Sequence, residues 1–101
     1  MLTIIEVLRN PRAFGLHNAL FAARSTLAPQ APCLVLDADD VERDEDEEPA
    51  AARDAGFAYI LQVADIDSVM RNLMTRYPQP SDALRFEAFM FYVERDAFYV
   101  V

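Results

Sequence analysis

The densest chemistry in the sequence is a run of carboxylates between Asp37 and Glu48. This window holds nine acidic residues and one base, Arg43, so its net charge is -8, equal to that of the whole 101-residue chain. The remaining sequence is therefore neutral. Charge concentrated in one segment steers an oppositely charged partner, whereas evenly spread charge mainly aids solubility. A nucleic acid would be repelled by this segment, so we expect no nucleic-acid partner.

The acidic window matches a calcium-binding loop only in part. Asp37, Asp39 and Glu48 occupy the first, third and twelfth places of the twelve-residue loop signature. Val41, however, stands where an oxygen ligand is needed, and Glu42 replaces the glycine of the sharp turn. We therefore expect no specific metal site and no cofactor.

Other reactive side chains are few. His17 is the only histidine and Cys33 the only cysteine. We expect His17 to be a polar residue at the entrance of a strand, and Cys33 to be a packed small hydrophobe. Nine similar carboxylates in water lack the separated pKa values that general acid-base catalysis requires. The sequence therefore predicts no catalytic residues and a protein that is not an enzyme.

Composition sets the broad class of the protein. A chain of 101 residues with 53% hydrophobic residues is expected to fold as a single domain over residues 1–101. No apolar run reaches the roughly 18 residues that span a bilayer, and the N-terminus lacks the features of a signal peptide. A lone cysteine fits a reducing compartment. We expect a cytoplasmic protein with no membrane partner.

Hydrophobic patterns predict the elements around the acidic window. Strands are expected at residues 17–23, 33–36 and 57–63, with the last one central in the sheet. The predicted fold class is α+β. It comprises a small three- to four-stranded, mostly antiparallel sheet packed against two main C-terminal helices, with short helices at the N-terminus and after the acidic loop.

The helices are predicted from caps and periodicity. Thr3 and Glu6 form a capping box at the start of the first short helix, and Gly56 ends the second. The first long helix is expected over residues 66–77, with Asp65 as its N-cap and Asp67 on its polar face. The second long helix is expected over residues 82–95.

The last helix carries two apolar stripes. A helix that is apolar on two sides is buried on two sides, either by its own fold or by a second chain. The residues that follow it, 97–101, are expected to form a short terminal strand or a hydrophobic clasp. The first stripe contains Phe86, Phe89, Met90 and Val93, and the second contains Leu84, Ala88 and Phe91, with Tyr92 beside it.

Several segments together resemble a known family. "CLVLDADD", "DEDEEP", "AGFAYIL", "IDSVMRN" and "AFMFYVERDAF" follow one another as in small acidic bacterial immunity proteins of toxin-immunity pairs, including contact-dependent growth inhibition modules. The matching positions are Leu36 to Asp40, Pro49, Phe57 to Leu61 and Asp96 to Phe98. The resemblance covers roughly residues 33–98, and the N-terminal part departs from it, since "FAARSTLAPQAP" lacks the expected aromatic residues.

The resemblance implies an immunity protein that neutralises a cognate toxin by stoichiometric occlusion. A nuclease toxin has to be basic to hold nucleic acid, so an acidic inhibitor would associate with it quickly. The expected partner is therefore a basic toxin domain. The expected partner-binding residues are the acids of the window after its first position: Asp39, Asp40, Glu42, Asp44, Glu45, Asp46, Glu47 and Glu48.

A second class of function stays open. The protein could be a homodimeric adaptor or structural protein that uses its aromatic C-terminal helix. The acidic loop would then be a solvated segment that serves solubility. The oligomeric state in the absence of a partner would separate the two interpretations.

Overall fold

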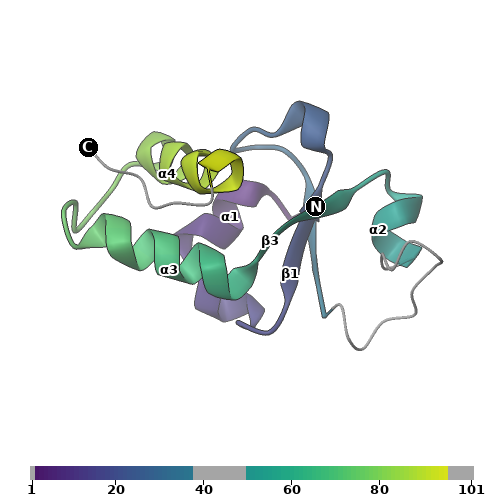
Figure 1. The fold of residues 1–101 in the computed structure, drawn as a ribbon, viewed down its shortest axis with the longest axis horizontal. Helices are drawn as coiled ribbons and strands as arrows, with labels where there is room; N and C mark the ends of the chain where they lie inside the picture. The colour runs from purple at the N-terminus through teal and green to yellow at the C-terminus, as the bar shows by residue number, and fades with distance from the viewer. Residues whose placement is uncertain (1, 38–49, 96–101) are drawn as a thin grey trace.

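The computed structural model describes residues 2–37 and 50–95 (Figure 1). Three strands form one antiparallel sheet in the order β2-β1-β3. The strands are β1 (Ala19–Ala22), β2 (Cys33–Leu36) and β3 (Ala58–Gln62), and the α-helices are α1 (Ile4–Arg9), α2 (Ala50–Asp54), α3 (Val63–Met74) and α4 (Asp82–Arg95). Short 3-10 turns, η1 (Pro11–Phe14) and η2 (Arg24–Thr26), flank β1. The predicted α+β class is confirmed.

The position of β3 in the sheet differs from the prediction. The aromatic and branched residues of β3 predict a central strand, but β3 lies at an edge and β1 is central. All four residues of β1 are buried, whereas Tyr59 and Gln62 of β3 are exposed. Aromatic and branched residues favour a half-buried pleated surface, and an edge strand provides one as well as a central strand does.

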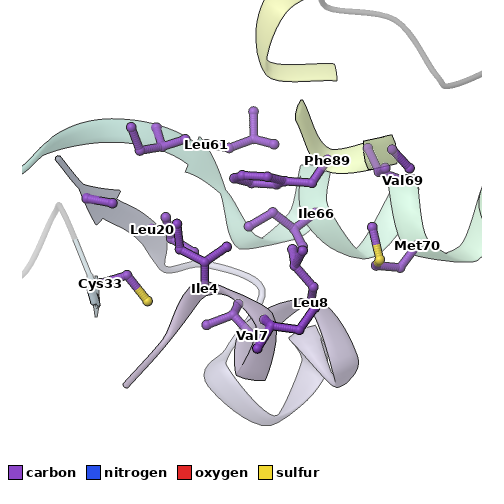
Figure 2. Packing of buried hydrophobic residues seen from close by; sticks show 14 of the residues in the cluster. Ile4, Val7, Leu8, Leu20, Cys33, Leu61, Ile66, Val69, Met70 and Phe89 are labelled. Carbon is purple, nitrogen blue, oxygen red and sulfur yellow. The ribbon is translucent and has the colours of Figure 1, made fainter. Parts of the chain in front are cut away.

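The main core lies on one face of the sheet, called here the first face. Figure 1 shows α1, α3 and α4 on this side of the strands, with α2 on the other side. Leu20 of β1 and Cys33 of β2 point into this core, where they meet side chains from the three helices (Figure 2). Fully or almost fully buried members from the helices are Ile4, Val7, Leu8, Ile66, Val69, Met70 and Phe89.

Helix α1 begins with the capping pair that the sequence predicts. The Glu6 carboxylate accepts hydrogen bonds from the Thr3 backbone N–H at 2.7 Å and from the Thr3 hydroxyl at 3.1 Å. The backbone hydrogen bond is the main reason that the pKa of Glu6 is lowered. The helix is thereby fixed at its start, and its apolar face, which includes Ile4 and Leu8, is delivered to the core.

Helix α3 begins three residues earlier than predicted, so Asp65 is not its N-cap. Gln62, the last residue of β3, occupies the N-cap position, and Val63 starts the helix directly. Val63 is fully buried and its N–H donates to the backbone oxygen of Asn18 at 2.9 Å. Tertiary packing therefore overrides the local capping signal.

Asp67, which was expected on the polar face of α3, is buried there. Asp67 is only 6% exposed. Its carboxylate accepts two hydrogen bonds from the Arg12 guanidinium, at 3.3 and 3.4 Å, and lies 3.7 Å from Arg71. Arg12 belongs to η1, which packs against α3, so the partner that allows this burial is distant in sequence.

Helix α4 has the predicted bounds, and its own fold covers part of both apolar stripes. Ala88 and Phe89 are fully buried. Five further side chains are partly buried against the same core: Leu84, Phe86, Met90, Tyr92 and Val93. The start of α4 is fixed to the end of α1 by a bidentate ion pair between Arg9 and Asp82. The strand or clasp expected over residues 97–101 lies outside the described residues. Within residues 2–37 and 50–95, no helix is long and apolar enough to cross a membrane.

Candidate partner-binding surface

The opposite face of the sheet, called here the second face, carries a smaller apolar cluster. Ala19 and Phe21 of β1 pack there with Ala52 of α2 and with Phe57. Leu34 and Leu36 of β2 are partly buried against this cluster. The second face therefore joins the end of β2 to the short helix α2.

This arrangement places the elements on both sides of the acidic segment on the second face. The strand that precedes the segment ends at Leu36, and α2, which follows it, begins at Ala50. Both flanking elements contribute to the cluster on the second face. All eight predicted partner-binding residues fall within residues 38–49 and so lie outside the described residues, as does most of the rejected calcium loop. The chain thus enters and leaves its acidic segment beside one face of the sheet.

Helix α2 is short and packs on the second face through Ala52. Ala52 is fully buried, and its backbone oxygen accepts a hydrogen bond from Phe57 N–H at 2.8 Å. Gly56 follows the helix with φ of 77°, a left-handed conformation that glycine adopts without strain. The predicted end of this helix is confirmed. The turn at Gly56 directs the chain back onto the sheet as β3.

His17 lies at the base of the acidic segment. Its Nε2 atom is 3.7 Å from Oδ2 of Asp37, the first acid of the window. The two residues meet because Ala19 pairs with Leu36 in the sheet, which brings the preceding turn beside the end of β2. The His17 side chain is 72% exposed, so this pair contributes little to stability. The predicted place of His17 at the entrance of a strand is confirmed.

Tyr59 adds an aromatic group to the second face. It is 38% exposed and packs edge-to-face on Phe21, with ring centroids 6.0 Å apart and an interplanar angle of 79°. Partial burial, followed by the charge of Asp65, raises the pKa of its phenol, which stays neutral at physiological pH. An exposed aromatic ring with a polar tip is a common element of protein interfaces.

The sequence does not predict the exposure of Tyr59 on the second face. Strict alternation along β3 would place Tyr59 and Leu61 on the same face of the sheet. An irregularity in the pairing with β1 instead puts Leu61 opposite Leu20 and Tyr59 opposite Phe21. Leu61 therefore joins the main core while Tyr59 lies on the second face. The sequence contains no signal for this irregularity.

The structure also places the other reactive groups. Cys33 is fully buried in the main core, as expected, and burial raises the pKa of its thiol to about 11. It is thus a protonated packing residue at neutral pH. Across residues 2–37 and 50–95, no cluster of three or more His, Cys, Asp or Glu side chains is arranged to hold a metal ion.

A family model described as a domain of unknown function, DUF7716, matches residues 1–101. The chain belongs to the DUF7716 family. No curated protein and no solved structure matches the chain. The description of the DUF7716 family assigns no activity.

Proposed function

We propose that this DUF7716 domain is a stoichiometric inhibitor that binds and neutralises a basic toxin domain, as an immunity protein does. The observation that carries the proposal is that the net charge is concentrated in one segment between elements that pack on an apolar cluster. A window of twelve residues, 37–48, holds all of the net charge of -8, while the elements on either side of it are held on one apolar cluster. A charged segment with both ends attached to a folded face is suited to contact with a partner.

The proposed mechanism is occlusion. A toxin that acts on nucleic acid carries a basic surface, and an acidic inhibitor gains fast association with it by electrostatic steering. In one well-measured nuclease-inhibitor complex, close charge pairs couple by about 1.5 to 7 kcal/mol. Here the contact acids would be Asp39, Asp40, Glu42, Asp44, Glu45, Asp46, Glu47 and Glu48.

Tyr59 would supply the apolar part of the same interface. Interfaces gain much of their energy from a few aromatic anchors surrounded by polar contacts. Tyr59 lies on the second face, which also holds α2 and the end of β2. A partner attracted by the acids would therefore find an exposed aromatic ring on the face where the acidic segment begins and ends.

The first experiment identifies the partner by position in the genome. The C-terminal domain of the protein encoded directly upstream is expressed alone and together with this chain. We expect the domain to be basic, to arrest growth when alone, and to form a one-to-one complex that restores growth. A neighbour that is not basic, or that does not bind, would contradict the proposal.

The second experiment tests the acids with matched charge. The test variant combines Asp44→Asn, Glu45→Gln, Asp46→Asn and Glu47→Gln, and the control combines Glu87→Lys and Glu94→Lys on α4, away from the second face. Both change the net charge by +4. We expect the test variant to slow association at low salt by at least about tenfold, and the control to change it much less. Equal effects of the two variants would show that net charge, and not the acidic segment, governs binding.

A homodimer joined through α4 is the second candidate. The observation that favours it is a groove of about 440 Å³ along this helix, lined in part by Phe86, Met90 and Phe91. A second copy could cover these side chains. Light scattering after size exclusion separates the candidates, because a stable dimer without any partner favours the adaptor and a monomer favours the inhibitor.

A further inference from the structure

A buried carboxylate on α3 is shared by two arginines. Asp67 accepts two hydrogen bonds from the Arg12 guanidinium, and its Oδ2 atom lies 3.7 Å from Nη1 of Arg71. In the ion pairs within residues 2–37 and 50–95, every other acid pairs with a single base, whereas Asp67 pairs with two. Arg12 and Arg71, called here the arginine pair, therefore bring one positive charge more than Asp67 balances.

The fold sets the positions of the arginine pair. Arg12 belongs to η1, in which Pro11 is buried and Phe14 is partly buried against the main core. This turn packs against α3. Arg71 lies four residues after Asp67, so their side chains project from the same side of α3. Packed elements that are distant in sequence thus bring the two guanidinium groups together.

Both arginines keep hydrogen-bond donors for another group. An arginine carries several N–H donors in a planar fork, and Arg12 uses only two of them for Asp67. At 3.7 Å, Arg71 is too far from Asp67 for a hydrogen bond. The side chains of Arg12 and Arg71 are 61% and 65% exposed. Since Arg12 already pairs with both oxygens of the carboxylate, the burial of Asp67 does not require Arg71.

The chemistry of the arginine pair favours a small oxyanion. Two guanidinium groups held around one carboxylate repel each other, and an anion that bridges them relieves the repulsion. Guanidinium donors match the oxygens of phosphate, which has enough acceptors to bond both groups at once. The net charge of -8 disfavours a long polyanion such as a nucleic acid. A small anion meets mainly the charges within about 8 Å at physiological ionic strength.

We propose that Arg12 and Arg71 bind the phosphate group of a small ligand, with Asp67 as the positioning residue that orients Arg12. The Asp67 side chain is only 9% exposed, so an approaching anion meets the two guanidinium groups before the carboxylate. The inference does not depend on the proposed inhibitor function. Helix α3 covers the first face, whereas Tyr59 and α2 lie on the second, so the two kinds of binding can be measured separately (Figure 1).

A titration of the full chain with inorganic phosphate tests the site. The side-chain Nε–Hε signals of the arginines are followed by NMR, with chloride at the same ionic strength as the control. We expect the signals of Arg12 and Arg71 to shift until they saturate, with one phosphate bound per chain. A parallel titration with glycerol phosphate identifies the source of the group. Tighter binding of the ester would indicate a phosphorylated small molecule, and equal binding would indicate phosphate itself.

Matched variants separate the site from general charge. Arg71→Gln and Arg53→Gln each remove one positive charge, and Arg53 lies on α2 with its side chain 57% exposed. We expect Arg71→Gln to weaken phosphate binding at least about tenfold, because it removes charged hydrogen bonds, and Arg53→Gln to weaken it less than about twofold. Arg71→Lys keeps the charge but loses the planar fork, so it should also weaken binding, by roughly threefold or more.

Two results would overturn the inference. Equal weakening in Arg71→Gln and Arg53→Gln would show that phosphate responds only to overall charge. Shifts that grow linearly with phosphate and spread over all arginine signals would show that no site exists. The melting temperature of each variant without phosphate checks that the fold is intact, and Arg71→Lys provides the same comparison if Arg71→Gln does not fold.

Discussion

The two faces of the sheet are covered in different ways. On the first face, α1, α3 and α4 enclose a core in which Leu20, Ile66 and Phe89 are fully buried. On the second face, the described covering helix is α2, which has five residues, and Tyr59 remains 38% exposed. Local opening follows the regions with few buried apolar contacts. Stability should therefore reside on the first face, and the second face should open more easily.

The difference is consistent with a division of labour. The second face holds Leu36, at the end of the strand before the acidic window, and Ala52 of the helix that follows it. If the acidic segment binds a partner as proposed, its attachment to a less stable face would let it adjust to that partner without disturbing the main core. The predictions below test whether the two faces differ in this way.

The largest expected effect is a truncation in the main core. Phe89→Ala should destabilise the protein by about 3 to 5 kcal/mol. The substitution loses the favourable free energy of burying an aromatic side chain and leaves a cavity in the core, because Phe89 is fully buried. Phe57→Ala on the second face should have a smaller effect, since Phe57 is 9% exposed and its smaller cluster can collapse around the gap. Urea denaturation of both variants measures the difference. A loss in Phe57→Ala as large as that in Phe89→Ala would remove the distinction between the faces.

The next effect concerns the buried carboxylate of the first face. Asp67→Ala should cost about 1 to 3 kcal/mol, because it removes an almost fully buried acceptor that two Arg12 hydrogen bonds satisfy. The Arg12 side chain is 61% exposed and can return to water, which limits the loss. Asp82→Ala, which removes an exposed pair with Arg9, should destabilise the protein less. The opposite order in thermal unfolding would show that the Asp67 pair is not structural.

Much of the first face was predictable because its signals are local. The capping pair Thr3 and Glu6, the bounds of α4 and the bounds of β2 all follow from residue spacing and turn residues. Three features were not predictable. The edge position of β3, the burial of Asp67 and the outward turn of Tyr59 each depend on a partner that is distant in sequence.

The candidate site shows the same limit. Composition alone identifies the acidic segment, since charge can be counted without a structure. Its attachment to the second face could not be predicted, because that depends on contacts of Ala52 and Phe57 with Phe21 of the central strand. An Ala-rich helix of five residues carries too little periodicity to reveal which side is buried.

A smaller effect is expected at the turn that ends α2. Gly56→Ala should cost about 1 to 2 kcal/mol, because φ of 77° is unfavourable for a residue with a side chain. Among the described residues other than its two chain neighbours, no atom lies within 4 Å of the added methyl group, so the expected cost comes from the backbone conformation. Hydrogen exchange should show faster opening of α2 with little change in α3.

Gly15→Ala is the comparison for this turn. Gly15 has φ of 80°, and an added Cβ would also lie 3.0 Å from the Asn18 side chain. It should therefore destabilise the protein more than Gly56→Ala does. If Gly56→Ala instead accelerated exchange across α3 and α1, the second face would be coupled to the main core and could not open separately.

The smallest expected effect is a pH dependence at the start of α1. The pKa of Glu6 is lowered from its ordinary value of 4.5, chiefly by the hydrogen bond from the Thr3 backbone N–H and then by that from the Thr3 hydroxyl. Because the pKa in the folded protein is below that of the unfolded chain, the stabilisation is fully present above about pH 4.5 and is lost as the pH falls through the lowered value.

Glu6→Gln should therefore lower the melting temperature at pH 7 and reduce its dependence on pH below about 5. Thr3→Val separates the two causes, since it removes the hydroxyl but keeps the backbone N–H that has the larger influence. We expect Thr3→Val to keep most of the pH dependence. If Thr3→Val abolished the pH dependence as fully as Glu6→Gln does, the Thr3 hydroxyl and not the Thr3 backbone N–H would be the main partner of the Glu6 carboxylate at the start of α1.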